Sequence, residues 1–330
     1  MTRLGAFILI AFVAAGCGGS SSNPSGPGSG GAEISTVATN YLNEVIGLMQ
    51  TNSINRARIN WSDFRSQVFQ RAQGAKTIAD TYPAISVALG LLDDHHSFLV
   101  TPTNAGVANP SGRRCSATST SVPTVPADVG YVKVTSFSGS DPAAVIAFAD
   151  SIQQQIRDAD RASLVGWIVD VRGNGGGNMW PMVAGVGAVL GNGVAGHFIP
   201  PVGTITPWSH QNGVALSGGA AAARVSTPYE LLQRDPRVAV LTDGLAASSG
   251  EAVVVSFRRR PNTRSFGTAT CGLSTANSTF PLSDRAMLFL TTAVMGDRTQ
   301  APYGDVIVPD ETIAGDAPVV ERAVAWVHGL

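Results

Sequence analysis

Ser248 has the sequence setting of a catalytic nucleophile. It lies in Ala246-Ala247-Ser248-Ser249-Gly250-Glu251, between an apolar run typical of a buried strand and a run typical of a helix. A serine at such a strand-to-helix turn exposes its hydroxyl, and the helix N-terminus stabilises negative charge that develops there. We predict that Ser248 attacks an acyl carbon; the simpler alternative is a serine that only caps the helix.

A candidate base lies in Asp93-Asp94-His95-His96-Ser97, where two of the five histidines stand side by side. A neutral histidine is the natural base for a serine hydroxyl, and it predicts one ionisation near neutral pH in a pH–rate profile. A metal site is the rival interpretation of this cluster. No third or fourth ligand follows at a useful spacing, so we predict neither a metal nor another cofactor.

A glycine-rich loop offers backbone donors for an anion. The segment Asp170-Val171-Arg172-Gly173-Asn174-Gly175-Gly176-Gly177-Asn178 directly follows an apolar run. Glycines let N–H groups approach a phosphate or an oxyanion closely, because no Cβ intervenes. The segment is not a P-loop, since no Gly-Lys-Ser/Thr follows, and its spacing does not fit the dinucleotide-binding fingerprint. A tight turn without chemical significance is the alternative.

The elements that must position these residues alternate between strands and helices. Strands are predicted at residues 130–134, 164–171, 238–242 and 286–292, and helices at 141–161, 182–190 and 252–259. This alternation predicts a parallel-type sheet covered by helices, in an α/β core at residues 129–330. Apolar residues at three-to-four spacing predict an N-terminal helical subdomain at residues 33–100. Residues 101–128, rich in Pro, Ser, Thr and Gly, predict a loop.

Residues 1–17 predict export and a lipid anchor. Arg3 gives a positive N-terminal region, and residues 7–13 form an apolar run too short to span a bilayer. Val13-Ala14-Ala15-Gly16-Cys17 resembles the lipobox of bacterial lipoproteins, which implies cleavage before Cys17 and a diacylglyceryl group on its sulfur. The alternative is a plain secretory signal with an incidental cysteine. Residues 18–32 predict a flexible tether, because they are almost wholly Gly, Ser and Pro.

These features predict a mature chain in the cell envelope, held to the membrane through its lipid anchor. Gly18, which is not Asp, favours the outer membrane by lipoprotein sorting habits, where the cell has one; the chain would then face the periplasm. In an oxidising compartment Cys115 and Cys271 could form one disulfide or remain two separate buried thiols.

Composition excludes one class of partner. The formal net charge of −1 gives no clustered basic face, which nucleic-acid binding requires. The basic run 258–260 is expected to be the solvated C-terminus of a helix, where cations are favoured. A hydrophobic content of 44% with 14% charged residues indicates a folded globular chain.

Five motifs in sequence order resemble those of the C-terminal processing (tail-specific) and tricorn-type serine peptidases. They are Asp94-x-His96-Ser97, Asp170-x-Arg172-Gly173-Asn174-Gly175-Gly176, Ser248-x-x-Glu251, Gly267-x-x-Thr270-x-Gly272 and Val308-Pro309-Asp310. The resemblance implies the α/β spiral fold shared with the ClpP and crotonase group. It also implies an oxyanion hole formed by the N–H of Ser249 with that of Gly175 or Gly176.

The resemblance also bears on the catalytic base. In the processing peptidases a lysine base follows Gly-x-x-Thr-x-Gly directly, and that position is Leu273 here. The only lysines, Lys76 and Lys133, both precede Ser248. In the tricorn-type peptidases the base is a histidine of the Asp-x-His segment. By this resemblance the base is His96, because His95 is one residue away from the position that the motif requires.

The sequence does not decide which residue orients His96. Tricorn-type peptidases place a serine just before the histidine, where this chain has His95, and a glutamate ahead of the Pro-Asp motif, where none occurs between Asp284 and Asp310. Asp94 is the nearest carboxylate in sequence, and Asp305 or Asp297 could serve instead.

Three functions remain compatible with these motifs. We expect a serine-type endopeptidase or processing peptidase that acts on peptides or unfolded proteins. The processing peptidases carry a PDZ domain between the Asp-x-His segment and the core, but about 30 residues here are too few for one. A catalytically silent ligand- or peptide-binding protein is the alternative, since retinoid-binding relatives share the scaffold. A crotonase-like acyl transfer would need an acidic base and a basic pocket for coenzyme A, for which no cluster is evident.

Overall fold

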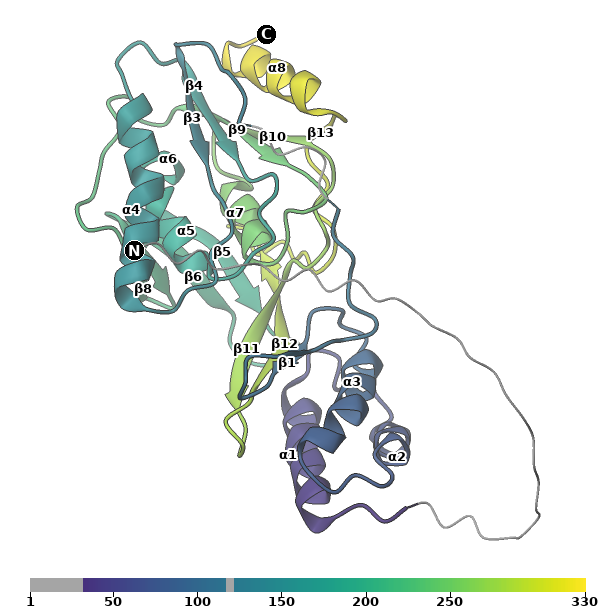
Figure 1. The fold of residues 1–330 in the computed structure, drawn as a ribbon. Coiled ribbons are helices and arrows are strands. Elements are labelled where there is room, and N and C mark those ends of the chain that lie inside the picture. The colour runs from purple at the N-terminus through teal and green to yellow at the C-terminus, as the bar shows by residue number, and fades with distance from the viewer. Residues whose placement is uncertain (1–31, 117–121) are drawn as a thin grey trace, which may run out of the picture.

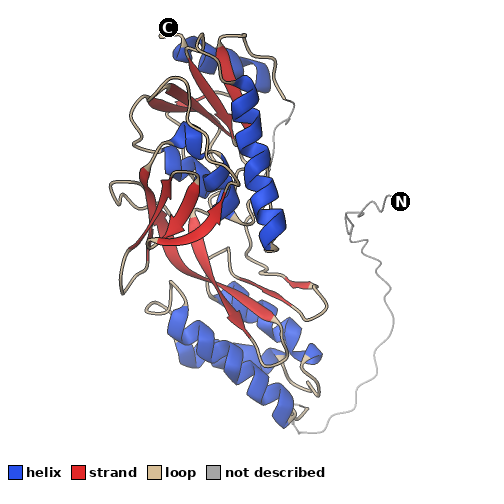
Figure 2. Ribbon diagram, turned by 90° about the vertical axis from the view of Figure 1, so that its left-hand side faces the viewer, coloured by secondary structure: helices blue, strands red, loops and turns tan. Residues whose placement is uncertain are grey.

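The computed structural model describes residues 32–116 and 122–330. The described chain is elongated, with helices at one end, an antiparallel sheet in the middle and a parallel sheet at the other end (Figures 1 and 2). The expected mixed α/β fold is confirmed. The predicted signal segment, Cys17 and the tether lie outside the described residues, apart from Ala32 at the tether's end. Within the two described ranges, no helix has the length and apolar character needed to cross a bilayer.

The N-terminal part of the described chain consists mainly of helices. They are α1 (Thr36–Asn52), α2 (Trp61–Arg71), the 3₁₀ helix η1 (Ala79–Thr81) and α3 (Tyr82–Leu91). Ser35 and Asn60 begin α1 and α2 by accepting hydrogen bonds from first-turn N–H groups. The apolar faces of these helices form one cluster with Leu288 and Leu290 of strand β12, which anchors the subdomain to the rest of the chain.

A five-stranded parallel sheet forms the far end of the core. Its order is β13 (Glu311–Thr312), β10 (Thr263–Gly267), β9 (Arg237–Thr242), β4 (Gly166–Asp170) and β3 (Val129–Lys133). Helix α4 (Pro142–Ala159) crosses from β3 to β4, and α8 (Asp316–Val327) packs against β4, β9 and β10. Every residue of β4 is buried, as the apolar run predicted.

An antiparallel sheet, which the sequence did not predict apart from one strand, joins the core to the helical subdomain. Its order is β2 (Gly106–Val107), β1 (Phe98–Val100), β12 (Met287–Gly296), β5 (Gly193–Ile199), β6 (Thr206–Gln211), β7 (Val214–Ser217) and β8 (Ala220–Arg224), with β11 (Thr275–Pro281) beside β12. Strand β12 is long enough to contact both the helical cluster and the core cluster.

Three helices fill the space between the two sheets. They are α5 (Met179–Gly185), α6 (Gly187–Leu190) and α7 (Ser249–Phe257). Helix α7 is buried along its whole length and packs against β9 of the parallel sheet and against β5 and β12 of the antiparallel sheet. The N-terminus of α7 is therefore held in place from both sides.

Candidate active site

Ser248 occupies a strained turn between β9 and α7. Its φ of 52° and ψ of −114° are unusual for a residue with a side chain. Such a backbone costs about 1–3 kcal/mol and persists only where surrounding contacts enforce it. Asp243 stabilises the turn by accepting N–H bonds from Leu245, Ala246 and Gly173. This is the geometry expected of a nucleophile that a strand-to-helix turn exposes.

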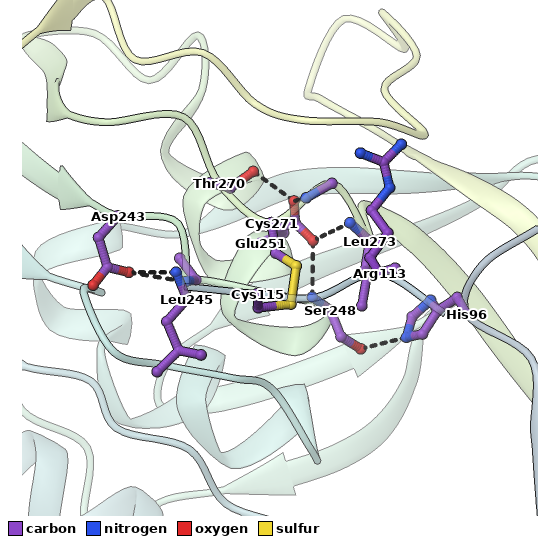
Figure 3. Close-up of a disulfide and its surroundings, with 12 residues drawn as sticks. His96, Arg113, Cys115, Asp243, Leu245, Ser248, Glu251, Thr270, Cys271 and Leu273 are labelled. Carbon is purple, nitrogen blue, oxygen red and sulfur yellow. Dashed lines mark hydrogen bonds between the residues drawn. A yellow bond between two sulfur atoms is a disulfide. The ribbon is translucent and has the colours of Figure 1, made fainter. Parts of the chain in front are cut away.

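His96 lies beside Ser248, across a large distance in sequence. Its Nε2 is 3.0 Å from Ser248 Oγ (Figure 3). Its Nδ1 is 2.7 Å from Thr275 Oγ1. A ring whose Nε2 accepts the serine proton must carry its own proton on Nδ1, so it donates that proton to Thr275. The two residues that the sequence selected as nucleophile and base are thus in hydrogen-bond contact.

The surroundings of His96 favour the neutral ring. Burial lowers the pKa of His96 from 6.5 to about 4, because the imidazolium loses hydration. The sequence-based expectation of an ionisation near neutral pH is therefore wrong: it assumed an ordinary, solvated histidine. A neutral ring is ready to accept a proton over a wide pH range.

The carboxylates proposed to orient His96 lie elsewhere. Asp94 accepts hydrogen bonds from the backbone N–H groups of His96 and Ser97, at 3.0 and 2.8 Å, and from the Ser97 hydroxyl. It therefore shapes the turn that carries His96. Asp305 is 69% exposed and forms an ion pair of 2.6 Å with Arg113.

The third aspartate, Asp297, is buried and accepts hydrogen bonds from Thr299 and Ala301 within its own turn. The hydroxyl of Thr275 occupies the Nδ1 side of the ring instead of a carboxylate. Sequence reasoning missed Thr275. A threonine has no distinctive signature in this role, and only the pairing of distant segments brings it to His96.

The glycine loop packs directly against the nucleophile turn. The Ala247 N–H donates to the carbonyl of Asn174 at 2.9 Å, and the Ser249 hydroxyl donates to the carbonyl of Gly177 at 2.6 Å. The loop is therefore in direct contact with the turn that carries Ser248.

Gly176 fits where a larger residue would not. A Cβ at this position would lie 2.9 Å from Ser248 Cβ, and the φ of +101° also favours glycine. The Gly176 N–H donates to the Asn174 side chain at 3.0 Å. Gly175 is exposed, whereas Gly176 is buried.

Glu251 links the nucleophile to a second loop. Its carboxylate is fully buried and accepts hydrogen bonds from the Ser248 N–H and the Thr270 hydroxyl (Figure 3). The N–H groups of Gly272 and Leu273 donate to the same carboxylate, at 2.9 and 2.8 Å. Burial raises the pKa of Glu251, and these hydrogen bonds oppose that rise. The Ser248-x-x-Glu251 and Gly267-x-x-Thr270-x-Gly272 motifs are therefore joined by one hydrogen-bond network.

A disulfide lies next to this network. Cys115 and Cys271 are bonded, with a Cα–Cα distance of 5.1 Å, which settles the question that the sequence left open (Figure 3). The Cys271 N–H donates to the carbonyl of Ala246 in the nucleophile turn. The disulfide thus ties the linker after the helical subdomain to the loop that supports Ser248 and Glu251.

Across residues 32–116 and 122–330, no cluster of three or more His, Cys, Asp or Glu side chains could hold a metal ion. Around Ser248 and His96 lie hydroxyls and backbone amides, which are the kinds of group that nucleophilic acyl transfer uses.

Comparison with known proteins decides the family. The profile described as Peptidase family S41 matches residues 128–313, more than half of the 330 residues. The chain belongs to peptidase family S41. The resemblance to the processing and tricorn-type peptidases, first seen in the motifs, is thereby confirmed.

Relatives of this S41 chain include a nisin-resistance protein of Lactococcus lactis subsp. lactis. It is 26% identical over 267 residues, which cover 81% of this chain and 80% of the relative. A lipoprotein from Streptococcus agalactiae has a similar structure, with a TM-score of 0.72, 21% identity and coverage of 90% of this chain and 98% of that one. The photosystem II D1 C-terminal processing protease is similar with a TM-score of 0.54, 14% identity and coverage of 88% and 97%. These two likenesses show the fold.

This S41 chain does not place a lysine at Ser248. Lys133 pairs with the buried Asp170 at 3.2 Å and donates to the carbonyl of Arg172, while Lys76 donates to the carbonyl of Glu33. Both lysines are engaged away from Ser248, in agreement with Leu273 at the position of the lysine base. His96 is the basic side chain in hydrogen-bond contact with Ser248.

Proposed function

We propose that this S41 chain is a serine-type peptidase of the cell envelope that cleaves peptides or unfolded proteins through an acyl-enzyme on Ser248. One observation carries the proposal: the neutral His96 ring lies 3.0 Å from the hydroxyl of a serine held in a strained strand-to-helix turn. Nucleophile and base at hydrogen-bond distance are the geometric requirement of this chemistry.

Attack begins at the substrate carbonyl. Ser248 Oγ forms a bond to the carbonyl carbon while its proton passes to His96 Nε2, and the carbonyl electron pair becomes an oxyanion. We assign the oxyanion donors to the N–H of Ser249, at the start of α7, and to that of Gly175. One such donor contributes about 100- to 1,000-fold to the rate.

Acyl transfer then proceeds in two steps. The imidazolium of His96 gives its proton to the leaving nitrogen as the peptide C–N bond breaks, which leaves an ester on Ser248. Water attacks this ester while His96 takes its proton, and the same ring returns the proton to Ser248 as the product acid departs. No step needs a group that the chain lacks.

In this proposal, substrate choice rests on the residues around Ser248 and not on a separate recognition domain. The linker between the helical subdomain and the core is too short for a PDZ domain and is fastened by the Cys115–Cys271 disulfide. A relative is named for nisin resistance, so nisin belongs in the substrate panel. We also propose Cys17 as the lipid-anchored residue, which a Cys17→Ser variant tests by releasing the chain from the membrane fraction.

Peptide hydrolysis tests the proposal. The mature chain is incubated with a peptide library that includes nisin, and products are read by mass spectrometry, alongside Ser248→Ala and His96→Ala. Cleavage that both substitutions abolish supports the peptidase, and His95→Ala is the matched control that should retain cleavage. Cleavage that persists in Ser248→Ala would contradict the mechanism.

A silent binding protein is the second candidate, and the missing carboxylate behind His96 is the observation that favours it. It predicts that the folded chain binds peptides without cleaving any of them.

A further inference from the structure

We infer that Thr275 is the positioning residue for His96, so that a neutral hydroxyl serves where serine peptidases commonly use a carboxylate. The inference rests on the proposed peptidase function. Its basis is the contact of 2.7 Å between Thr275 Oγ1 and His96 Nδ1.

Strand β11 holds His96 at two points. Thr275, the first residue of β11, is only 7% exposed and pairs with Val294 of β12. Two residues later, the Asn277 side chain donates to the backbone carbonyl of His96 at 3.1 Å. The same strand therefore fixes both the main chain and the ring of the histidine.

The Thr275 hydroxyl can serve as the acceptor that the productive tautomer requires. His96 Nε2 can accept the proton of Ser248 only if Nδ1 carries the ring hydrogen. In that tautomer Thr275 Oγ1 accepts the hydrogen of Nδ1, and Nε2 is left free and aimed at Ser248. A hydroxyl provides this orientation but adds no negative charge behind the ring.

The charged groups around the site are bonded elsewhere. Asp94 bonds to its own turn, Arg113 pairs with Asp305, and Glu251 holds the loop that precedes β11. The lowered pKa of His96, which has burial as its cause, agrees with a ring that faces no carboxylate of the described residues.

The position of Thr275 in the chain adds to the argument. It stands two residues after Leu273, which occupies the place of the lysine base in the processing peptidases. The segment that follows the Gly-x-x-Thr-x-Gly motif thus reaches the histidine. In this chain it acts through the histidine.

Three substitutions test the inference through the rate of fluorophosphonate labelling at Ser248, measured across pH. Thr275→Val keeps the shape and removes the hydroxyl, so labelling should slow by about 10- to 100-fold, as when a buried N–H loses its partner. Thr275→Ser keeps the hydroxyl and should stay within about threefold of the wild type. Thr275→Asp should move the acid limb of labelling upward by about 1–3 pH units, because a carboxylate beside an imidazole raises its pKa.

A second measurement does not depend on labelling. The ¹⁵N chemical shifts of the His96 ring report the tautomer, which should be the Nδ1–H form in the wild type and a mixture in Thr275→Val. Circular dichroism confirms that each variant is folded. Wild-type labelling and tautomer in folded Thr275→Val would overturn the inference and leave the peptidase intact, whereas a wild-type chain that Ser248 probes never label would overturn both.

Discussion

Replacing Glu251 with glutamine keeps the size of the side chain but removes one of its two acceptor oxygens. Four donors converge on this buried carboxylate: the N–H groups of Ser248, Gly272 and Leu273 and the hydroxyl of Thr270. The Ser248 and Leu273 N–H groups share one oxygen, and the Thr270 hydroxyl and Gly272 N–H share the other. A glutamine keeps an acceptor for one of these two pairs of donors and places its own NH₂ group against the other pair.

The magnitude follows from the two donors that lose their acceptor. Each buried donor left unsatisfied costs about 1–3 kcal/mol, so Glu251→Gln should reduce the free energy of unfolding by about 2–6 kcal/mol. A domain typically has about 5–15 kcal/mol, so the variant should still fold at low temperature. Its Ser248 turn loses a contact that enforces the strained backbone, and labelling should slow by at least about 10-fold.

The assay pairs urea denaturation with the rate of fluorophosphonate labelling at a temperature where the variant is folded. Glu230→Gln, at an exposed carboxylate, is the matched control and should change neither quantity. A loss of stability below about 1 kcal/mol together with wild-type labelling would refute the structural role assigned to Glu251.

Four further results follow from the site. Because burial lowers the pKa of His96 to about 4, labelling should stay constant from neutral pH to about pH 5 and fall to half near pH 4; a midpoint near 6.5 would contradict this. Between pH 6.5 and 4, His96 is protonated in the unfolded chain but not in the folded one. This histidine therefore lowers the free energy of unfolding as the pH falls. Reduction of the Cys115–Cys271 disulfide, or its replacement by two serines, should cost about 2–4 kcal/mol of stability in thermal unfolding and slow labelling; unchanged kinetics would refute its link to the site. Gly176→Ala places a Cβ 2.9 Å from the nucleophile's own Cβ and should abolish labelling in a chain that circular dichroism shows to be folded; normal labelling would contradict the close packing.

Local patterns in the sequence revealed the parallel half of the fold. The apolar runs of β4 and β9 are buried on both faces and so read as strands from composition alone. The antiparallel sheet was missed because its strands lack alternation: β8 is four alanines and an arginine, and β11 is largely polar. Pairing with β7 and β12, rather than local propensity, makes them strands.

The site divides in the same way. Ser248 and His96 could be found from short motifs, because in each case the reactive side chain and the neighbours that identify it lie within a few residues. Thr275 could not, since its role arises from a contact with a residue 179 positions away, and the disulfide joins cysteines 156 positions apart. The pKa of His96 was also out of reach, because it depends on burial by segments that only the fold brings together.

Stoichiometric labelling by a fluorophosphonate tests the central claim most directly. The folded mature chain should gain one phosphonyl group, which peptide mapping should locate on Ser248. Labelling should fall by at least about 100-fold in His96→Ala, because general-base help is worth about 100- to 10,000-fold. A folded chain that stays unlabelled at Ser248, or that labels equally well without His96, would contradict a serine peptidase built on these two residues.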